Sequence, residues 1–391
     1  MAFARPAARL GVAAGICLCL SVAGAACGGD EGDGGREARS DAAGVAAAER
    51  QLDRFRGIPE FTPPGPAFEA SSKVRGTLIY EIPITSEVPF IGAVEQGMEQ
   101  AADEVGADLV VFPNQGKPSQ WAQGIRTAIA RKADAILLLA QDPELAGPAL
   151  AEAREAGIPV ISLRTTGEGE PCAARAEGSA PVETCVPAPF EQAGRLEADW
   201  VIAASGGSAD VLVITSNDAR STAPLVRGLR QEFERNCPGC ELRFVDVPIP
   251  AWATDIRTEV QSALVRDPGI DYVIPAYDSM SQFIVPALRA GGADDRVDIS
   301  TFNGTPFVLK MLQDGDVVEM DVGEDLAWVG WASMDQAFRV IAGVPPVPSE
   351  RTPLRVFDDD NVDEAGRPPR FDRGYGRAYV DGYRELWGVK R

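Results

Sequence analysis

An arginine directly after an apolar run is the most unusual chemical feature of this sequence. The run IPVISL at 158–163 is followed at once by Arg164. A guanidinium has five N–H donors and no acceptor, and its burial is costly unless an anionic or polar group meets it. Either a small ligand or a carboxylate such as Glu87 or Asp278 could meet it. We expect the ligand, and therefore a preference for ligands rich in acceptor oxygens.

The residues needed for most hydrolytic chemistry are missing. The chain contains no histidine, which removes Ser-His-Asp and Cys-His nucleophilic machinery and every metal site that needs imidazole. It also contains no G-x-S-x-G, no phosphate-binding loop and no dinucleotide fingerprint. We therefore expect a binding protein and not an enzyme, with no catalytic residue, no metal and no cofactor.

Length and charge limit the partners. The 391 residues suffice for two domains with cores of their own, and the net charge is −21. Such a surface repels nucleic acid and anionic membranes. We expect a monomer whose direct partner is a small polar molecule.

The first residues predict export. Arg5 and Arg9 precede the apolar run GVAAGICLCLSVAGAA at 11–26, which is too short to span a membrane and is typical of a secretory signal. The following AGAAC resembles the lipobox of bacterial lipoproteins, although Gly24 stands where an aliphatic residue is usual. We expect lipid on Cys27 and an anchor on the outer face of the cell membrane. Secretion without lipid is the alternative.

Four cysteines remain after the signal and Cys27 are set aside. An even number in an oxidising compartment predicts disulfides, and four cysteines permit three pairings. Proximity favours Cys172–Cys185 and Cys237–Cys240, the second of which encloses a Pro-Gly turn. A redox dithiol is the weaker interpretation of CPGC, because Cys237 lies at the end of a helical pattern and not at a helix N-terminus.

The body of the chain alternates between strand and helix patterns. Residues 27–72 are read as a lipidated and mostly disordered tether, with a possible short helix at 41–56. Beyond Lys73 the predicted strands are GTLIYEI, DLVVF, AILLL, PVISL, DVLVIT, LRFVDV, YVIPA and DISTF. The predicted helices lie near 89–105, 118–132, 143–156, 189–204, 220–236, 253–266 and 279–291. This alternation predicts an α/β fold of two Rossmann-like lobes with parallel sheets, broken once by an irregular stretch at 166–188. The carboxyl ends of their strands would face a shared cleft.

Residues 73–391 resemble type I periplasmic sugar-binding proteins of the ribose- and galactose-binding group. The resemblance rests on IPITSEVPFIGAVEQGMEQAADEVGADLVVFP, ADAILLLAQDPELAGPALAEAREAGIPVISL, IDYVIPAYDSMSQFIVPALRAGG, DISTFNGTPFVLKMLQDGDVV and YVDGYRELWG. It implies three crossovers near Ala188, Gly323 and Pro348. The N-terminal lobe would then comprise 73–188 and 324–348, and the C-terminal lobe 189–323 and 349–391.

The resemblance also implies a ligand site in the cleft. The matching positions are Thr85, Ser86, Glu87, Phe90, Arg164, Thr165, Trp252, Tyr277, Asp278, Asn303 and Glu324. Two departures are notable. The family's acid before the arginine is absent, with Arg164-Thr165 in place of the pair, and Leu225 stands where an arginine is common. Acids that accept hydrogen bonds from sugar hydroxyls are thus lost, which argues against a plain pentose as the ligand.

By this resemblance the protein is an extracytoplasmic solute-binding lipoprotein that delivers a sugar or a similar small polar ligand to the permease subunits of an ABC importer. A sensory protein that reports to a membrane receptor or kinase is the alternative, because it would use the same lobes. A transcription repressor of this fold is excluded by the export signal and the missing DNA-binding helices.

Overall fold

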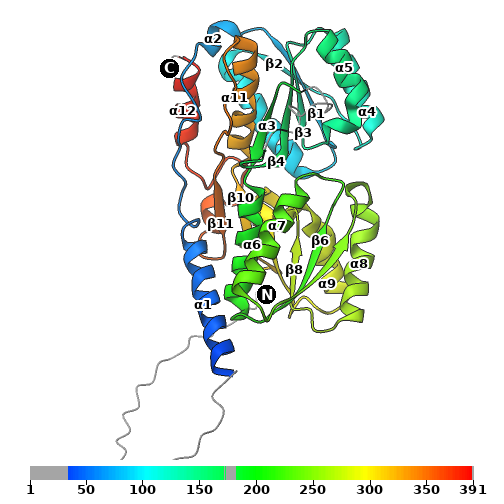
Figure 1. The fold of residues 1–391 in the computed structure, drawn as a ribbon, viewed down its shortest axis with the longest axis vertical. Helices are drawn as coiled ribbons and strands as arrows, with labels where there is room; N and C mark the ends of the chain where they lie inside the picture. Colours follow the sequence, from blue (N-terminus) through cyan, green and yellow to red (C-terminus); the bar gives the residue numbers. More distant parts are fainter. Residues whose placement is uncertain (1–33, 171, 173–181, 390–391) are drawn as a thin grey trace, which may run out of the picture.

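The computed structural model describes residues 34–389 except 171 and 173–181. The signal and Cys27 lie outside these residues. None of the described helices is long and apolar enough to cross a membrane. The molecule has two lobes stacked along its long axis, each with a central sheet between helices (Figure 1).

The first lobe contains a parallel sheet of strand order β2-β1-β3-β4-β5. Its strands are β1 (Leu78–Pro83), β2 (Asp108–Val111), β3 (Ala135–Leu139), β4 (Val160–Gly167) and β5 (Thr184–Ala188). Its helices are α2 (Ala70–Lys73), α3 (Pro89–Val105), α4 (Pro118–Ala130), α5 (Gly147–Glu155), α11 (Leu326–Ala342) and α12 (Ala378–Leu386). The stretch that the sequence suggested as irregular therefore contains the edge strand β5.

The second lobe contains a sheet of order β11-β10-β9-β8-β6-β7, in which only β11 runs antiparallel to its neighbour. Its strands are β6 (Asp210–Thr215), β7 (Glu241–Asp246), β8 (Tyr272–Pro275), β9 (Asp298–Asn303), β10 (Val318–Glu324) and β11 (Leu354–Phe357). Its helices are α1 (Gly34–Asp53), α6 (Phe190–Ser205), α7 (Thr222–Asn236), α8 (Trp252–Arg266), α9 (Ser281–Ala290) and α10 (Pro306–Gln313).

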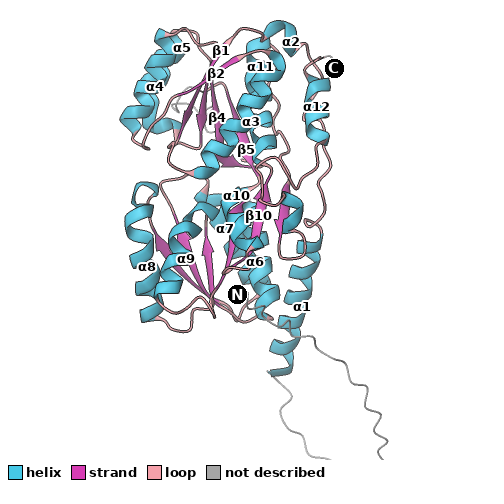
Figure 2. Ribbon diagram, turned by 180° about the vertical axis from the view of Figure 1, so that it is seen from behind, coloured by secondary structure: helices cyan, strands magenta, loops and turns pink. Residues whose placement is uncertain are grey.

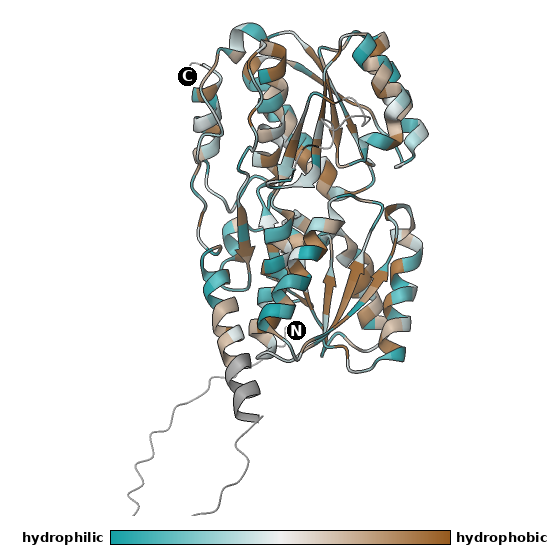
Figure 3. Ribbon diagram, in the orientation of Figure 1, coloured by the Kyte–Doolittle hydropathy of each residue, from teal (hydrophilic) through white to brown (hydrophobic). Residues whose placement is uncertain are grey.

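The apolar residues gather in the strands, as Figure 3 shows. Every residue of β3 and β4 is buried, which is why neither the run AILLL of β3 nor the stretch VISL of β4 alternates between apolar residues and exposed polar ones. Helices α3 and α11 pack against each other through glycines. A Cβ on Gly330 would lie 2.5 Å from backbone atoms of Gly97 and Met98, so the two helices approach more closely than larger residues would allow.

Within the described residues, three connections cross between the lobes from β5 to β11, and a fourth leads from β11 to α12 on the first lobe (Figure 2). The chain leaves the first sheet after β5, returns to the first lobe at Asp325 between β10 and α11, and enters the second sheet again at β11. Both disulfides that proximity favours are present. Their Cα atoms are 5.6 Å apart in Cys172–Cys185 and 5.4 Å apart in Cys237–Cys240.

The structure corrects the expected boundaries at both ends of the chain. Within the stretch read as a tether, α1 packs on the second lobe with Ala48 and Leu52 buried. Residues 54–69, which we call the strap, then run to the first lobe beside α12 (Figure 1). The C-terminal segment also differs, because α12 buries Tyr383 and Trp387 in the first lobe and not in the second. In both cases a few large apolar side chains inside a polar stretch determine where the segment packs.

Candidate functional site

Two adjoining cavities lie between the lobes, where the carboxyl ends of both sets of parallel strands meet. They share the walls Ile84, Val88, Ile249 and Trp252. We call the larger one, of about 330 Å³, the outer pocket. The smaller one, of about 50 Å³, is the inner pocket and is lined by Arg164. This position is where open α/β sheets bind ligands.

Arg164 is met by Glu324. Its Nη1 and Nη2 atoms donate to the two carboxylate oxygens at 2.9 and 2.5 Å, and the two side chains are only 4% and 0% exposed. The alternative partners to a ligand, Glu87 and Asp278, were therefore wrong, because the carboxylate that meets Arg164 is that of Glu324. Glu324 is the last residue of β10 in the second sheet and Arg164 belongs to β4 in the first, a proximity that no local pattern in the sequence reveals.

The Arg164 guanidinium also lies over two aromatic rings. Its Cζ atom is 5.1 Å from the centroid of Phe90 and 5.2 Å from that of Phe190, which is cation–π range. The backbone of Arg164 has φ of 59°, within an irregularity of β4 between the pairs Leu163↔Val186 and Gly167↔Ala188. At this irregularity β4 departs from the regular pairing of a strand.

Four of the sequence-derived site residues line neither pocket, namely Glu324, which pairs with Arg164, and Ser86, Thr165 and Asp278. Asp278 is fully buried and accepts hydrogen bonds from the N–H and Oγ1 of Thr305 at 2.6 and 2.7 Å, and burial raises its pKa to about 7. Thr165 shares a hydrogen bond of 2.8 Å with Ser162, and the hydroxyl of exposed Ser86 accepts from the Asn114 N–H at 3.1 Å. These contacts hold the loops around the cleft.

Trp252, Tyr277 and Asn303 form the second-lobe wall of the inner pocket. The Trp252 Nε1–H donates to Ser216 Oγ at 2.8 Å, and this bond fixes the indole, which also lines the outer pocket. The Tyr277 hydroxyl is 2.7 Å from that of Ser221, and burial raises the pKa of the phenol. On the first lobe, Thr85 and Glu87 line the outer pocket.

Sequence reasoning missed much of the outer pocket. The missed lining residues include Gln115, Trp121, Asp218, Gln282 and Phe283, and Phe190 was missed in the inner pocket. Gln115 and Asp218 each follow a predicted strand, so their position at strand ends was a usable signal. Gln282 and Phe283 lie on a helix whose sequence does not distinguish a pocket-facing residue from any other.

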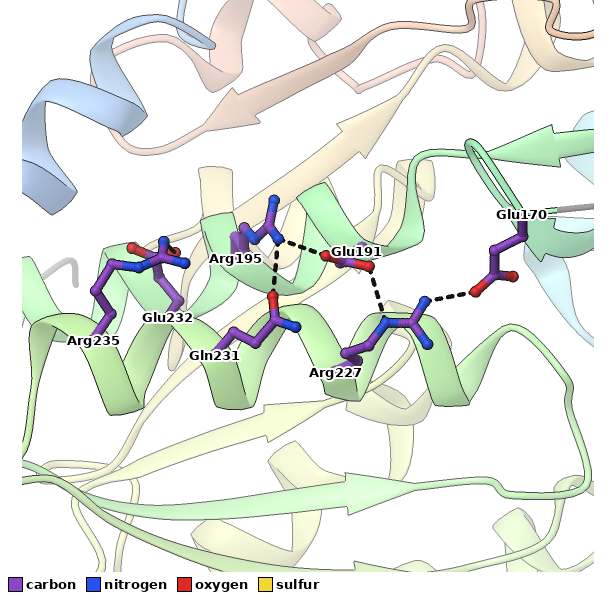
Figure 4. A network of polar contacts seen from close by, with 7 residues as sticks. All are labelled: Glu170, Glu191, Arg195, Arg227, Gln231, Glu232 and Arg235. Atoms are coloured by element: carbon purple, nitrogen blue, oxygen red, sulfur yellow. Dashed lines mark hydrogen bonds and ion pairs between the residues drawn. The ribbon is translucent and has the colours of Figure 1, made fainter.

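Ion pairs connect the lobes at the rim of the cleft. Arg220, after β6, pairs with Asp142, after β3, at 3.2 Å. Glu170, in the turn after β4, accepts from Arg227 of α7 at 2.6 Å, and Arg227 also donates to Glu191 of α6 at 2.9 Å (Figure 4). Each pair is partly exposed and individually weak, but together they bring the loops of the two lobes into one charged network.

Within the described residues, one group of acids has metal-ligand proximity, namely Asp358, Asp359 and Asp360. It lies after β11 and outside the cleft, and one oxygen of Asp358 is already paired with Arg56 at 2.8 Å. The described walls of the two pockets offer carboxylates, amides and aromatic rings, which suit a polar organic molecule better than a metal ion.

A family profile for the periplasmic binding protein domain matches residues 79–344, and the chain belongs to this family. It is 24% identical to the ribose import binding protein of Escherichia coli over 65% of this chain and 81% of that one. It is 25% identical to the D-apiose import binding protein of Actinobacillus succinogenes over 59% of this chain and 71% of that one.

Solved structures agree with the fold. An ABC transporter solute-binding protein from Agrobacterium vitis bound with α-D-tagatopyranose aligns with a TM-score of 0.65 at 20% identity, over 73% of this chain and 96% of that chain. One from Actinobacillus succinogenes with bound D-allose aligns with the same score and identity, over 73% of this chain and 99% of that chain. The fold of this protein is that of type I periplasmic binding proteins, as its sequence indicated.

Proposed function

We propose that this protein is the extracytoplasmic solute-binding component of an ABC importer and binds a neutral, sugar-like ligand between its lobes. The observation that carries the proposal is the cleft itself, whose described walls combine aromatic rings with amides, hydroxyls and carboxylates contributed by both lobes. Aromatic faces suit the apolar side of a sugar ring, and the polar groups suit its hydroxyls. The named relatives are import proteins for ribose and D-apiose, which supports the same reading.

The charges of the cleft favour a neutral ligand over an anionic one. Arg164 is the only cationic residue among the described pocket walls, and Glu324 neutralises it. The other charged walls are the carboxylates of Glu87 and Asp218. They can accept hydroxyl hydrogen bonds but repel a sugar acid or a sugar phosphate. This replaces the expectation that Arg164 selects ligands rich in acceptors.

The protein would act by closure and without catalysis. A ligand that contacts Glu87 on the first lobe and Asp218 and Trp252 on the second stabilises the closed arrangement of the lobes, and the permease recognises that arrangement. We propose a monomer, anchored by lipid on Cys27. A Cys27→Ala variant should then leave the membrane fraction, and its retention there would contradict the anchor.

The test is a panel of D-ribose, D-allose, D-tagatose and D-apiose, with D-glucuronate and ribose 5-phosphate as anionic comparisons. A ligand at a hundredfold excess over its dissociation constant stabilises the native state by about 2.7 kcal/mol, which a melting curve detects. We expect at least one neutral sugar to raise the melting temperature and to bind in calorimetry. Binding of the anions alone would refute the neutral-ligand proposal.

A further inference from the structure

The inner pocket is already filled by the protein. Its free volume is about 50 Å³, which is room for a few water molecules and well below the roughly 300 Å³ at which ligand pockets begin. The Arg164 guanidinium lies over the rings of both Phe90 and Phe190, and so occupies faces on which a flat ligand could stack.

The guanidinium is held there firmly. Both of its terminal nitrogens donate to Glu324, and both side chains are almost completely buried. A ligand that displaced Arg164 would leave the Glu324 carboxylate unpaired in the interior, which is strongly unfavourable. The pair and its two phenylalanines therefore form the floor of the cleft and not a vacant subsite.

The outer pocket has the properties that the inner one lacks. Its volume of about 330 Å³ is within the range of small-molecule sites. Its aromatic walls are fixed in place, because Trp121 Nε1 donates to the Ile84 carbonyl at 3.0 Å and Trp252 Nε1 donates to Ser216. Gln282 donates through Nε2 to the Ser279 carbonyl at 2.8 Å, which orients its amide.

We propose that the ligand ring binds in the outer pocket, above the Arg164–Glu324 floor. Contacts come from Gln115 and Trp121 on the first lobe and from Trp252, Gln282 and Phe283 on the second. Arg164 is a positioning residue that supports this floor and is not the main ligand donor. The proposal rests on the proposed function, because it locates the ligand within the same cleft.

Two variants, each of which fills a different pocket, can test whether the ligand binds in the outer one. Ala219 lines only the inner pocket and Ala253 only the outer one. We expect Ala253→Trp to weaken binding of the best sugar of the panel at least tenfold in calorimetry, and Ala219→Val to change it less than threefold. A second pair of variants removes polar groups and adds no bulk. Gln282→Ala should weaken binding at least tenfold, and Tyr277→Phe should weaken it less than threefold. Melting curves without ligand verify that each variant is folded.

The outcomes distinguish a failure of this inference from a failure of the proposed function. Loss of binding in Ala219→Val with retention in Ala253→Trp places the ligand in the inner pocket and overturns this inference alone. Loss in both, or retention in both, also contradicts binding in the outer pocket. If no sugar of the panel binds the unaltered protein, the proposed function fails and the inference fails with it.

Discussion

The ion pair of Arg164 and Glu324 joins residues that are 160 positions apart and come from different sheets. Removing two charges from water costs about as much as their attraction returns, so such a pair adds little net stability. Here the pair affects the charge and the shape of the cleft. It neutralises the only cation among the described walls of the two pockets and holds a flat group over the rings of Phe90 and Phe190.

We expect Glu324→Ala to lower the free energy of unfolding by about 3–5 kcal/mol, because the substitution leaves a buried guanidinium without a partner. The double variant Arg164→Met with Glu324→Leu should recover most of that loss. Denaturant unfolding measures both.

The matched control is Glu152→Ala, which breaks the exposed pair with Arg126 and should leave the unfolding midpoint unchanged. A Glu324→Ala variant as stable as the control would show that water reaches the guanidinium and that the pair is not the floor of the cleft.

The strap adds a connection between the lobes to the four crossovers that follow it in the described chain. Near its start the Phe55 carbonyl accepts from the Val356 N–H at 2.9 Å, next to β11 of the second lobe. Farther along, the ring of Phe61 packs 5.6 Å from Trp328 and 5.2 Å from Tyr383 in the first lobe. At its end the Phe68 N–H donates to the Leu386 carbonyl at 2.7 Å. The strap thus contacts both lobes.

Phe61→Ala should lower the free energy of unfolding by about 1–3 kcal/mol, less than for a fully buried phenylalanine, because its ring is only partly buried. Thermal and denaturant melts give the value. Ile58→Ala, at a strap residue that is 57% exposed, is the control and should have no measurable effect. Equal effects of the two substitutions would mean that the strap does not pack through Phe61.

At the scale of the whole molecule, an acidic chain buries many of its carboxyl groups. The net charge is −21, and burial raises the pKa of Asp278 to about 7 and that of Asp325 to about 8. Burial also raises the pKa values of Glu81, Glu197 and Asp321. These groups hold protons in the folded protein at pH values where the unfolded chain has released them. The native state therefore binds more protons than the unfolded state, and stability falls as pH rises from about 4 to 8.

We expect the melting temperature to be higher at pH 5 than at pH 8. A single such group contributes a slope of about −1.4 kcal/mol per pH unit. Asp325→Asn should reduce the slope of stability against pH by about the contribution of one group. Asparagine keeps an oxygen for the hydrogen bond that Asp325 accepts from the Trp328 N–H at the start of α11. Stability that rises between pH 5 and 8 would contradict the raised pKa values.

Much of this architecture can be predicted from short stretches of the sequence. Alternating apolar and amphipathic segments predict two parallel sheets, because each element is defined by periodicity within about fifteen residues. Loops after strands predict the cleft, and the family resemblance implies that Thr85, Glu87, Trp252 and Tyr277 lie in it. Short spacing also favours the disulfides Cys172–Cys185 and Cys237–Cys240.

Only the tertiary structure decided which distant residues meet. The partner of Arg164, the packing of the strap and the return of α12 to the first lobe all depend on where crossovers place segments that are far apart in the chain. The division of the cleft into a filled inner pocket and an open outer one depends on side-chain packing from both lobes. Local periodicity carries no information about such contacts, because they arise only when the two sheets come together.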